Sequence, residues 1–168
     1  ITHWDLQHVK TISYHNVRNV GDADLAGLRY FPRLERLSLH RTAVTDEGMR
    51  HVSPLTNLKA LSLKHTEITD AGLEHLAGLT RLERLQLSPT KIQGSGLKHL
   101  SEMHELRELE LGGIPLTDED FLHLAGAEHM RELSLLGAQI KGSSLSMLAN
   151  FQELEQFTIY AGNQLQEI

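Results

Sequence analysis

The stretch LKALSLKHTEITDAGL, residues 58–73, decides the fold. In its first half, Leu61 and Leu63 alternate with polar neighbours, as on one face of a short β-strand. Its second half leads into Leu73 and Leu76, whose spacing of three places them on one apolar stripe of a short helix. The stretch therefore predicts one strand followed by one helix.

The same frame recurs with a period of 24, and apolar residues fill its columns. Three strand columns comprise Leu34, Leu58, Leu82, Leu106, Met130 and Leu154; Leu37, Leu61, Leu85, Leu109, Leu133 and Phe157; and Leu39, Leu63, Leu87, Leu111, Leu135 and Ile159. The first copy begins one position earlier than this period requires, so we expect one inserted residue, in a bulged turn near Arg18 and Asn19. Stacked copies can bury apolar faces that a single copy cannot. Because helices are wider than strands, the stack must curve with its strands on the concave side.

The frame Leu58-x-x-Leu61-x-Leu63-x-x-Thr66-x-Ile68-Thr69-Asp70-x-Gly72-Leu73 resembles the leucine-rich-repeat family. It is similar to the bacterial variety in which Thr replaces the Asn or Cys of other subtypes. The resemblance covers roughly residues 9–159. It implies an α/β fold, namely a right-handed solenoid with a parallel concave β-sheet of about seven strands and short convex helices. It implies a protein-binding role, although the fold is weakly specific for function.

We interpret residues 1–168 as a single leucine-rich-repeat domain. Residues 1–8 form a partial N-terminal cap or half-repeat, residues 9–153 form six repeats, and residues 154–168 form a partial last repeat. Trp4 is a candidate for part of a cap, because the ends of a solenoid expose its core. The frame fails at Gly162 and Gln164. Alternatively, the chain is a piece of a longer array, and its start at Ile1 favours a processed or trimmed fragment.

Two polar columns have structural interpretations. Asp22, Asp46, Asp70 and Asp118 precede the helical stripes, so we expect them to cap the helix N-termini. Gln93 and Lys141 take that place in two repeats, whose helices should start less cleanly. Thr42, Thr66 and Thr90 form the internal column that, in the family, turns the chain after the strand and bonds neighbouring backbone.

Composition narrows the class of protein. The chain is 40% hydrophobic and 23% charged, as is typical of folded soluble domains. It has no cysteine, which excludes disulfides and thiolate chemistry and, together with the missing signal segment, leans weakly toward the cytoplasm. The net charge of −6 disfavours nucleic acid as a partner. No stretch approaches the roughly 20 apolar residues of a membrane span.

The charge is unevenly distributed between the two halves of the chain. Residues 1–84 carry +1 and residues 85–168 carry −7. On the predicted concave face, the N-terminal strands are basic, and the C-terminal strands combine acidic residues with an exposed Leu and Tyr. Gly112, Gly113 and Gly137 leave the backbone there open to close approach. The predicted partner-binding residues are Arg36, His40, Lys64, Arg84, Glu108, Glu110, Glu132, Leu136 and Tyr160. The alternative is that these are ordinary solvated sheet residues, with Tyr160 buried under a C-terminal cap.

The most regular polar column is His51, His75, His99 and His123. Shared metal sites along this column are disfavoured. Helix axes about 8–10 Å apart cannot bring imidazole nitrogens of neighbouring repeats within the roughly 2.0–2.1 Å of one zinc ion that coordination needs. Repeat duplication on a partly exposed convex face explains the column, and a pH-sensitive surface is the alternative. We find no nucleophile elbow, phosphate loop or dinucleotide motif, so we expect no catalytic residue, cofactor or metal.

The predicted function is therefore a protein-binding scaffold that uses its concave sheet and rim. The alternative is an inhibitor or immunity-type protein that blocks a partner enzyme, with its acidic patch facing a basic target. The sequence does not identify the partner.

Overall fold

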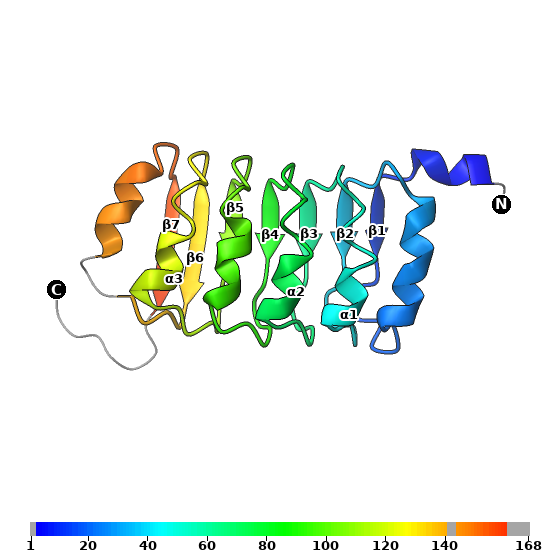
Figure 1. The fold of residues 1–168 in the computed structure, drawn as a ribbon, viewed down its shortest axis with the longest axis horizontal. Helices are drawn as coiled ribbons and strands as arrows, with labels where there is room; N and C mark the ends of the chain where they lie inside the picture. Colours follow the sequence, from blue (N-terminus) through cyan, green and yellow to red (C-terminus); the bar gives the residue numbers. More distant parts are fainter. Residues whose placement is uncertain (1–2, 141–143, 161–168) are drawn as a thin grey trace.

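The chain forms a curved ribbon of stacked strand–helix units in the computed structural model, which describes residues 3–140 and 144–160 (Figure 1). Seven parallel strands form one sheet in chain order. They are β1 (Thr11–Ser13), β2 (Arg36–Ser38), β3 (Ala60–Ser62), β4 (Arg84–Gln86), β5 (Glu108–Glu110), β6 (Glu132–Leu136) and β7 (Gln156–Tyr160). The fold is thus the predicted leucine-rich-repeat solenoid with a seven-stranded parallel sheet.

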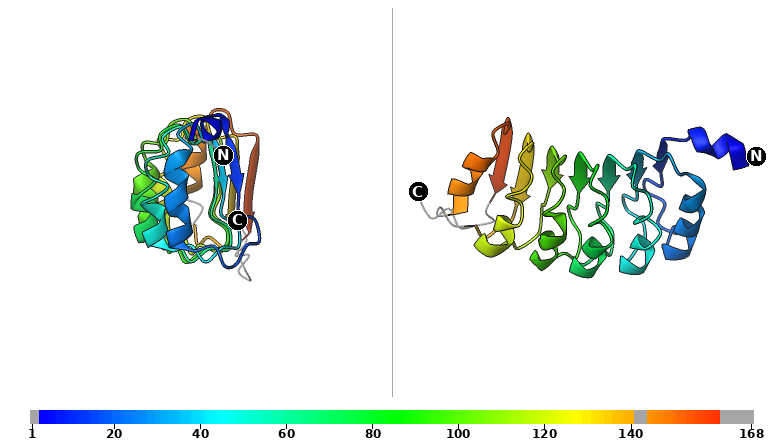
Figure 2. Two further views of the ribbon diagram at one scale, coloured as in Figure 1. Left: turned by 90° about the vertical axis from the view of Figure 1, so that its right-hand side faces the viewer. Right: turned by 45° about the horizontal axis from the view of Figure 1, so that its top comes forward.

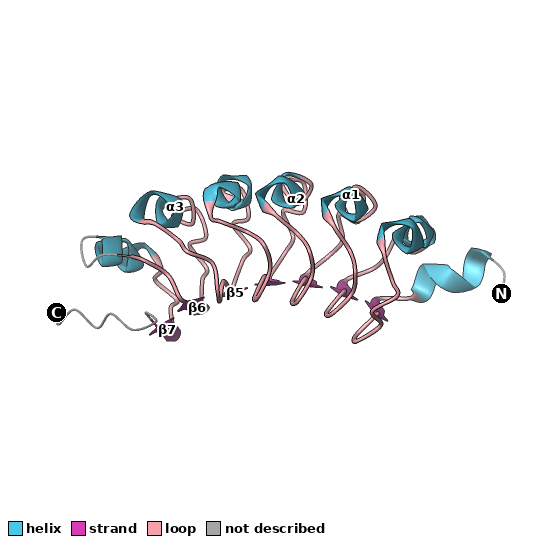
Figure 3. Ribbon diagram, turned by 90° about the horizontal axis from the view of Figure 1, so that it is seen from below, coloured by secondary structure: helices cyan, strands magenta, loops and turns pink. Residues whose placement is uncertain are grey.

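Short helices form the second layer, which lies on one side of the strands in an end-on view, apart from the N-terminal helix (Figure 2). The described residues form three α-helices and four 3-10 helices: α1 (Asp46–Met49), α2 (Asp70–Glu74), α3 (Asp118–Leu122), η1 (His3–His8), η2 (Asp22–Tyr30), η3 (Ser95–Leu100) and η4 (Ser144–Asn150). Seen along the strands, the helices follow the outer arc and the strands the inner arc (Figure 3). The wider helices therefore impose the curvature, and the free face of the sheet is concave.

The strands pair so that equivalent leucines of successive repeats are direct neighbours. Leu37 pairs with Leu61, Leu61 with Leu85, and Leu85 with Leu109. All four side chains are at most 2% exposed. They stack into one continuous core, so each repeat depends on its neighbours for burial.

The inserted residue of the first repeat lies between β1 and η2. Ile12 pairs with Leu37. The two residues are one position further apart in the sequence than the repeat period, in agreement with the offset predicted from the sequence. Arg18 and Asn19 form a turn, and the N–H of Val20 donates to the carbonyl oxygen of Val17 at 3.0 Å. The turn absorbs the extra residue and leaves the stacking unchanged.

The prediction that aspartates cap the helices is wrong. The N-cap residues of α1, α2 and α3 are the preceding threonines, and the Thr69 hydroxyl accepts from the N–H of Ala71 at 3.3 Å. Each aspartate is the first helical residue, and in α1 its carboxylate reaches the next repeat. Asp46 accepts from the N–H of Thr69 at 2.8 Å and from its hydroxyl at 2.6 Å. Asp22, the first residue of η2, contacts Thr45 in the same way. These bonds tie the helix starts of adjacent repeats together.

The repeat that contains η3 departs from this pattern of aspartate–threonine hydrogen bonds. Gly94, not Gln93, occupies the place of the aspartate, and Gln93 occupies that of the capping threonine. Asp70 accepts from both of their N–H groups at 3.2 Å. Gly94 has φ +120° and gives η3 no side-chain cap, so this segment starts less regularly, as expected for this repeat. The other such position, Lys141, lies outside the described residues.

The threonine column closes the turn after two of the strands. The hydroxyl of Thr42 donates to the carbonyl oxygen of Leu39 at 2.7 Å, and that of Thr66 donates to Leu63 at 2.6 Å. Both threonines are buried. The buried hydroxyl of Thr90 has no partner within the described chain, so the third member of the column does not make the expected bond.

Candidate functional site: the concave sheet

The concave face carries two shallow hollows. The first, called the N-terminal hollow, measures about 450 Å³ and lies over β1 to β4. The second, called the C-terminal hollow, measures about 170 Å³ and lies over β4 to β7. Arg84 and Gln86 line both hollows, so the two meet on β4. Because the leucines of each strand point into the core, polar side chains of alternating positions form the floor of both hollows.

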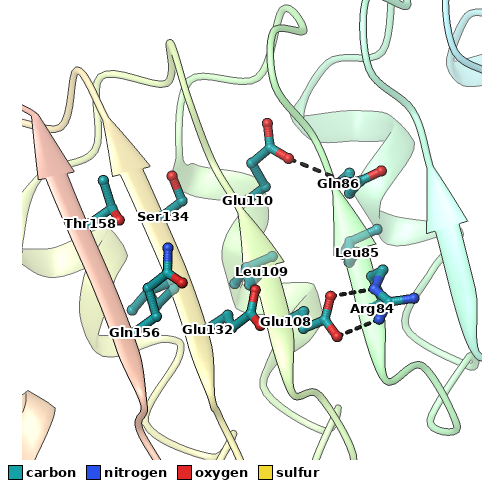
Figure 4. Close-up of a pocket in the computed structure, with 11 residues that line it drawn as sticks. Arg84, Leu85, Gln86, Glu108, Leu109, Glu110, Glu132, Ser134, Gln156 and Thr158 are labelled. Carbon is teal, nitrogen blue, oxygen red and sulfur yellow. Dashed lines mark hydrogen bonds and ion pairs between the residues drawn. The ribbon is translucent and has the colours of Figure 1, made fainter.

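Opposite charges meet where the hollows join. Arg84 contacts Glu108 on the neighbouring strand through Nε and Nη2 (Figure 4). The Glu108 hydrogen bonds raise the pKa of Arg84, and those of Arg84 lower the pKa of Glu108. Lys64 Nζ donates to both carboxylate oxygens of Glu110, at 2.8 and 3.0 Å. Gln86 donates to the same carboxylate at 3.2 Å. The structure thus brings four of the predicted binding residues together in two ion pairs at the centre of the sheet.

The other predicted residues lie nearer the ends of the sheet. Arg36 Nε donates to the Thr11 hydroxyl on β1 at 3.1 Å. Glu132 is exposed beside Glu108 and forms no ion pair within the described part of the chain (Figure 4). Leu136 is 40% exposed at the end of β6. Tyr160 ends β7, and its side chain lies outside what the structure describes. Arg36 and Glu132, which are in no ion pair among the described residues, therefore lie toward opposite ends of this face.

Three histidines in contact form a cluster that the sequence reasoning missed. The His15 and His40 rings meet edge to face, with centroids 4.3 Å apart. The His40 and His65 rings are stacked, with centroids 5.3 Å apart. In the sequence, His40 and His65 belong to adjacent columns, so a search along single columns overlooks them. Their separation exceeds the repeat period by a single position, and this is the signal that could have found the contact.

The convex histidine column is a separate feature. His51, His75, His99 and His123 lie near the ends of the helical segments. Among the described residues, no group of three or more histidines and carboxylates could hold a metal ion. In the same part of the chain, no helix has the length and apolar character needed to cross a membrane.

The Arg84–Glu108 pair predicts a modest pH dependence of stability. Because its pKa in the folded protein is lowered, Glu108 contributes stability that is present above its unfolded pKa and lost as the pH falls through the folded value. Both side chains are partly exposed, so we expect Glu108→Gln to lower the free energy of unfolding at pH 7 by about 0.2–1 kcal/mol. Urea unfolding at pH 7 and pH 3 checks this. The difference between wild type and variant should shrink at pH 3, and a larger difference there would contradict the assignment.

Comparisons with known proteins agree with this architecture. Residues 55–77 match a family model described as a leucine-rich repeat. No curated protein matches the chain. Among solved structures, the internalin inlF of Listeria monocytogenes superimposes with a TM-score of 0.65 and 21% identity. The internalin C2 of the same species gives 0.64 and 20%.

The two alignments differ in how much of each neighbour they include. Each covers 95% of this chain. The chain spans 50% of inlF and 84% of internalin C2. At these identities the likeness concerns the fold, and it agrees with the repeat recognised at residues 55–77. The chain therefore has a leucine-rich-repeat fold, with one repeat recognised at residues 55–77.

Proposed function

We propose that this chain is a non-enzymatic scaffold that recognises a protein partner through its concave sheet and rim. The observation that carries the proposal is the pair of joined hollows, which extend over all seven strands. Outward side chains line them, while leucines on the other face of the same strands fix their positions. A broad, shallow, rigid face fits the surface of another protein better than a small molecule, which favours an enclosed site.

The charge pattern of the face supports an oriented partner. Arg36 lines the N-terminal hollow and Glu132 lines the C-terminal hollow, and neither is in an ion pair among the described residues. A partner segment with acidic groups over β1–β3 and basic groups over β5–β7 would match both ends. Such complementarity fixes orientation and speeds association more than it raises affinity.

An inhibitor or immunity-type role is less well supported. It would rely on a strong acidic patch against a basic enzyme. Glu108 and Glu110 are already paired with Arg84 and Lys64, which leaves Glu132 as the unpaired acid of that hollow among the described residues. The weakened patch favours a scaffold over a tight acidic plug.

The test uses substitutions on opposite faces with a partner isolated by affinity capture on the wild-type chain. We expect Leu136→Ala, Tyr160→Ala and Glu132→Arg each to weaken binding by about tenfold or more, since interface anchors cost at least about 1–2 kcal/mol when truncated. The matched control is Glu74→Arg, the same charge change on the exposed surface of α2. Surface plasmon resonance gives the affinities. Unchanged affinity in all three concave variants, or a loss with Glu74→Arg instead, would refute the proposal.

A further inference from the structure

The histidine cluster lies at one end of the concave face. His15 and His40 line the N-terminal hollow together with Arg36 and Lys64. His40 is the central ring, held between His15 and His65. The three residues come from the turns that follow β1, β2 and β3, so stacking of the repeats brings them together. The cluster is thus a composite of three repeats.

The groups that act on His40 are basic. Burial is the main cause that lowers the pKa of His40, followed by repulsion from His15, Arg41, His65 and Lys64. The Nε2 atom of His40 is buried and has no hydrogen-bond partner in the described structure. Lys64, one of these basic groups, is itself bound to both carboxylate oxygens of Glu110 on β5. Among the described residues none of the three histidines forms an ion pair with a carboxylate, so a proton taken up by His40 has no anion to balance it.

The backbone of the same turns gives independent support. Arg41 and His65 have φ values of 57° and 56°, in the left-handed region. At the corresponding turns of later repeats, Gly113 and Gly137 also have positive φ. For a residue with a Cβ this conformation costs roughly 1–2 kcal/mol, and such strain concentrates at functional positions. The first repeat has Asn16 at this position, also with positive φ, and the next two repeats keep a basic or imidazole side chain where glycine would be easier.

We infer that the His15–His40–His65 cluster is a proton-dependent binding site for a short carboxylate-rich segment of a protein partner. The inference rests on the proposed function, because it assigns the cluster to the partner of the same concave face. Burial and the surrounding basic groups lower the pKa of His40, so its imidazole is uncharged at neutral pH. When His40 takes up a proton at lower pH, partner carboxylates offset its repulsion from the neighbouring basic side chains.

The direction of the pH effect follows from linkage. A carboxylate bound at the cluster raises the pKa of His40, so binding takes up a proton. Affinity must then increase as the pH falls, by up to about tenfold per pH unit for each proton taken up. The gain in affinity is complete below the pKa of His40 in the free protein, and it is lost as the pH rises through the pKa of His40 in the complex.

The geometry limits the length of the acidic segment. Neighbouring strands are about 4.8 Å apart, so the cluster spans about 10 Å, the reach of roughly three extended residues. Beyond it, Glu108 and Glu110 are already paired with Arg84 and Lys64, and Glu132 repels further negative charge. A short acidic stretch therefore fits, whereas a long polyanion such as a nucleic acid does not.

The test measures binding of a fluorescein-labelled tetra-aspartate peptide by fluorescence anisotropy at pH 5.5 and pH 7.5, in low salt. We expect at least tenfold tighter binding at pH 5.5, because aspartate stays ionised at both values. His40→Gln and His65→Gly should each remove most of this difference. His65→Gly relieves the left-handed backbone and should fold at least as well as wild type, so its loss of binding would not reflect unfolding. The matched control is His99→Gln in η3, which should bind like wild type.

Three results would overturn the inference: equal affinity at both pH values, an unchanged pH dependence in both cluster variants, or preferential binding of a single-stranded oligonucleotide. The proposed function fails separately. If the peptide binds as expected but concave substitutions leave partner binding intact, the cluster site stands and the scaffold proposal falls. If the peptide does not bind but concave substitutions abolish partner binding, only this inference falls.

Discussion

Replacing Leu85 with alanine should lower the free energy of unfolding by about 2–5 kcal/mol, the range for removing a buried leucine side chain. Leu85 is fully buried on β4, the central strand, and pairs with Leu61 and Leu109. The cavity would open in the middle of the stack, where it weakens contacts with repeats on both sides. Urea unfolding followed by circular dichroism measures the change.

The control for this variant is Leu136→Ala, the same substitution at a partly exposed site on β6. We expect it to cost well under half as much, because less of its side chain leaves water on folding. Equal losses in the two variants would mean that the stacked leucines do not form the stabilising core.

Asp46→Ala should be the second most damaging change, with a loss of about 2–3 kcal/mol. The carboxylate accepts two hydrogen bonds from Thr69 in the next repeat, and its removal leaves a partly buried N–H without its acceptor. Thermal and urea unfolding of Asp46→Ala, Thr69→Ala and the double variant measure the coupling between these side chains. A coupling energy near zero would mean that the hydrogen bonds between Asp46 and Thr69 do not stabilise the contact between adjacent repeats.

The matched control is Glu47→Ala, one residue along the same helix. Glu47 is exposed and pairs with Arg50 at the end of α1, so its loss should change stability by less than about 0.5 kcal/mol. This comparison separates the contact between repeats from the general effect of an acidic residue at a helix start.

The sequence was sufficient to predict the sheet and its buried face. In a solenoid, the repeat length fixes which residues become neighbours, so the leucine columns lead directly to pairs such as Leu61 with Leu85. The one-residue offset at Ile12 was also legible, because it shifts a whole block of apolar positions. These features follow from the regular spacing of apolar residues, which is visible in a single sequence.

The role of the aspartates was harder to predict, because two acceptors are adjacent. Threonine and aspartate both cap helices well, and the sequence alone does not say which of Thr69 and Asp70 takes the cap. The structure gives the cap to the threonine and directs the aspartate of one repeat to the threonine of the next. That choice depends on where the backbone of the next repeat lies, and the capping propensities of single residues carry no information about it.

The arrangement of the binding face was only partly predictable. Its candidate residues follow from alternation along the strands, but their pairing depends on side-chain reach. Arg84 and Glu108 are one repeat period apart in the sequence and are direct neighbours on adjacent strands. Lys64 and Glu110 lie nearly two repeats apart and meet across β4. The basic and acidic halves of the face therefore neutralise each other at their junction. The net charges of residues 1–84 and 85–168 could not indicate this pairing.

The most direct test of the concave binding face is photo-crosslinking from two positions in one repeat. A photoreactive amino acid replaces Ser62, on the concave face of β3, or Ala71, exposed on α2. Each variant is irradiated with the isolated partner, and the adducts are identified by mass spectrometry. We predict a discrete adduct from position 62 and none from position 71. An adduct from position 71 with none from position 62 would place the partner on the helices and contradict the account.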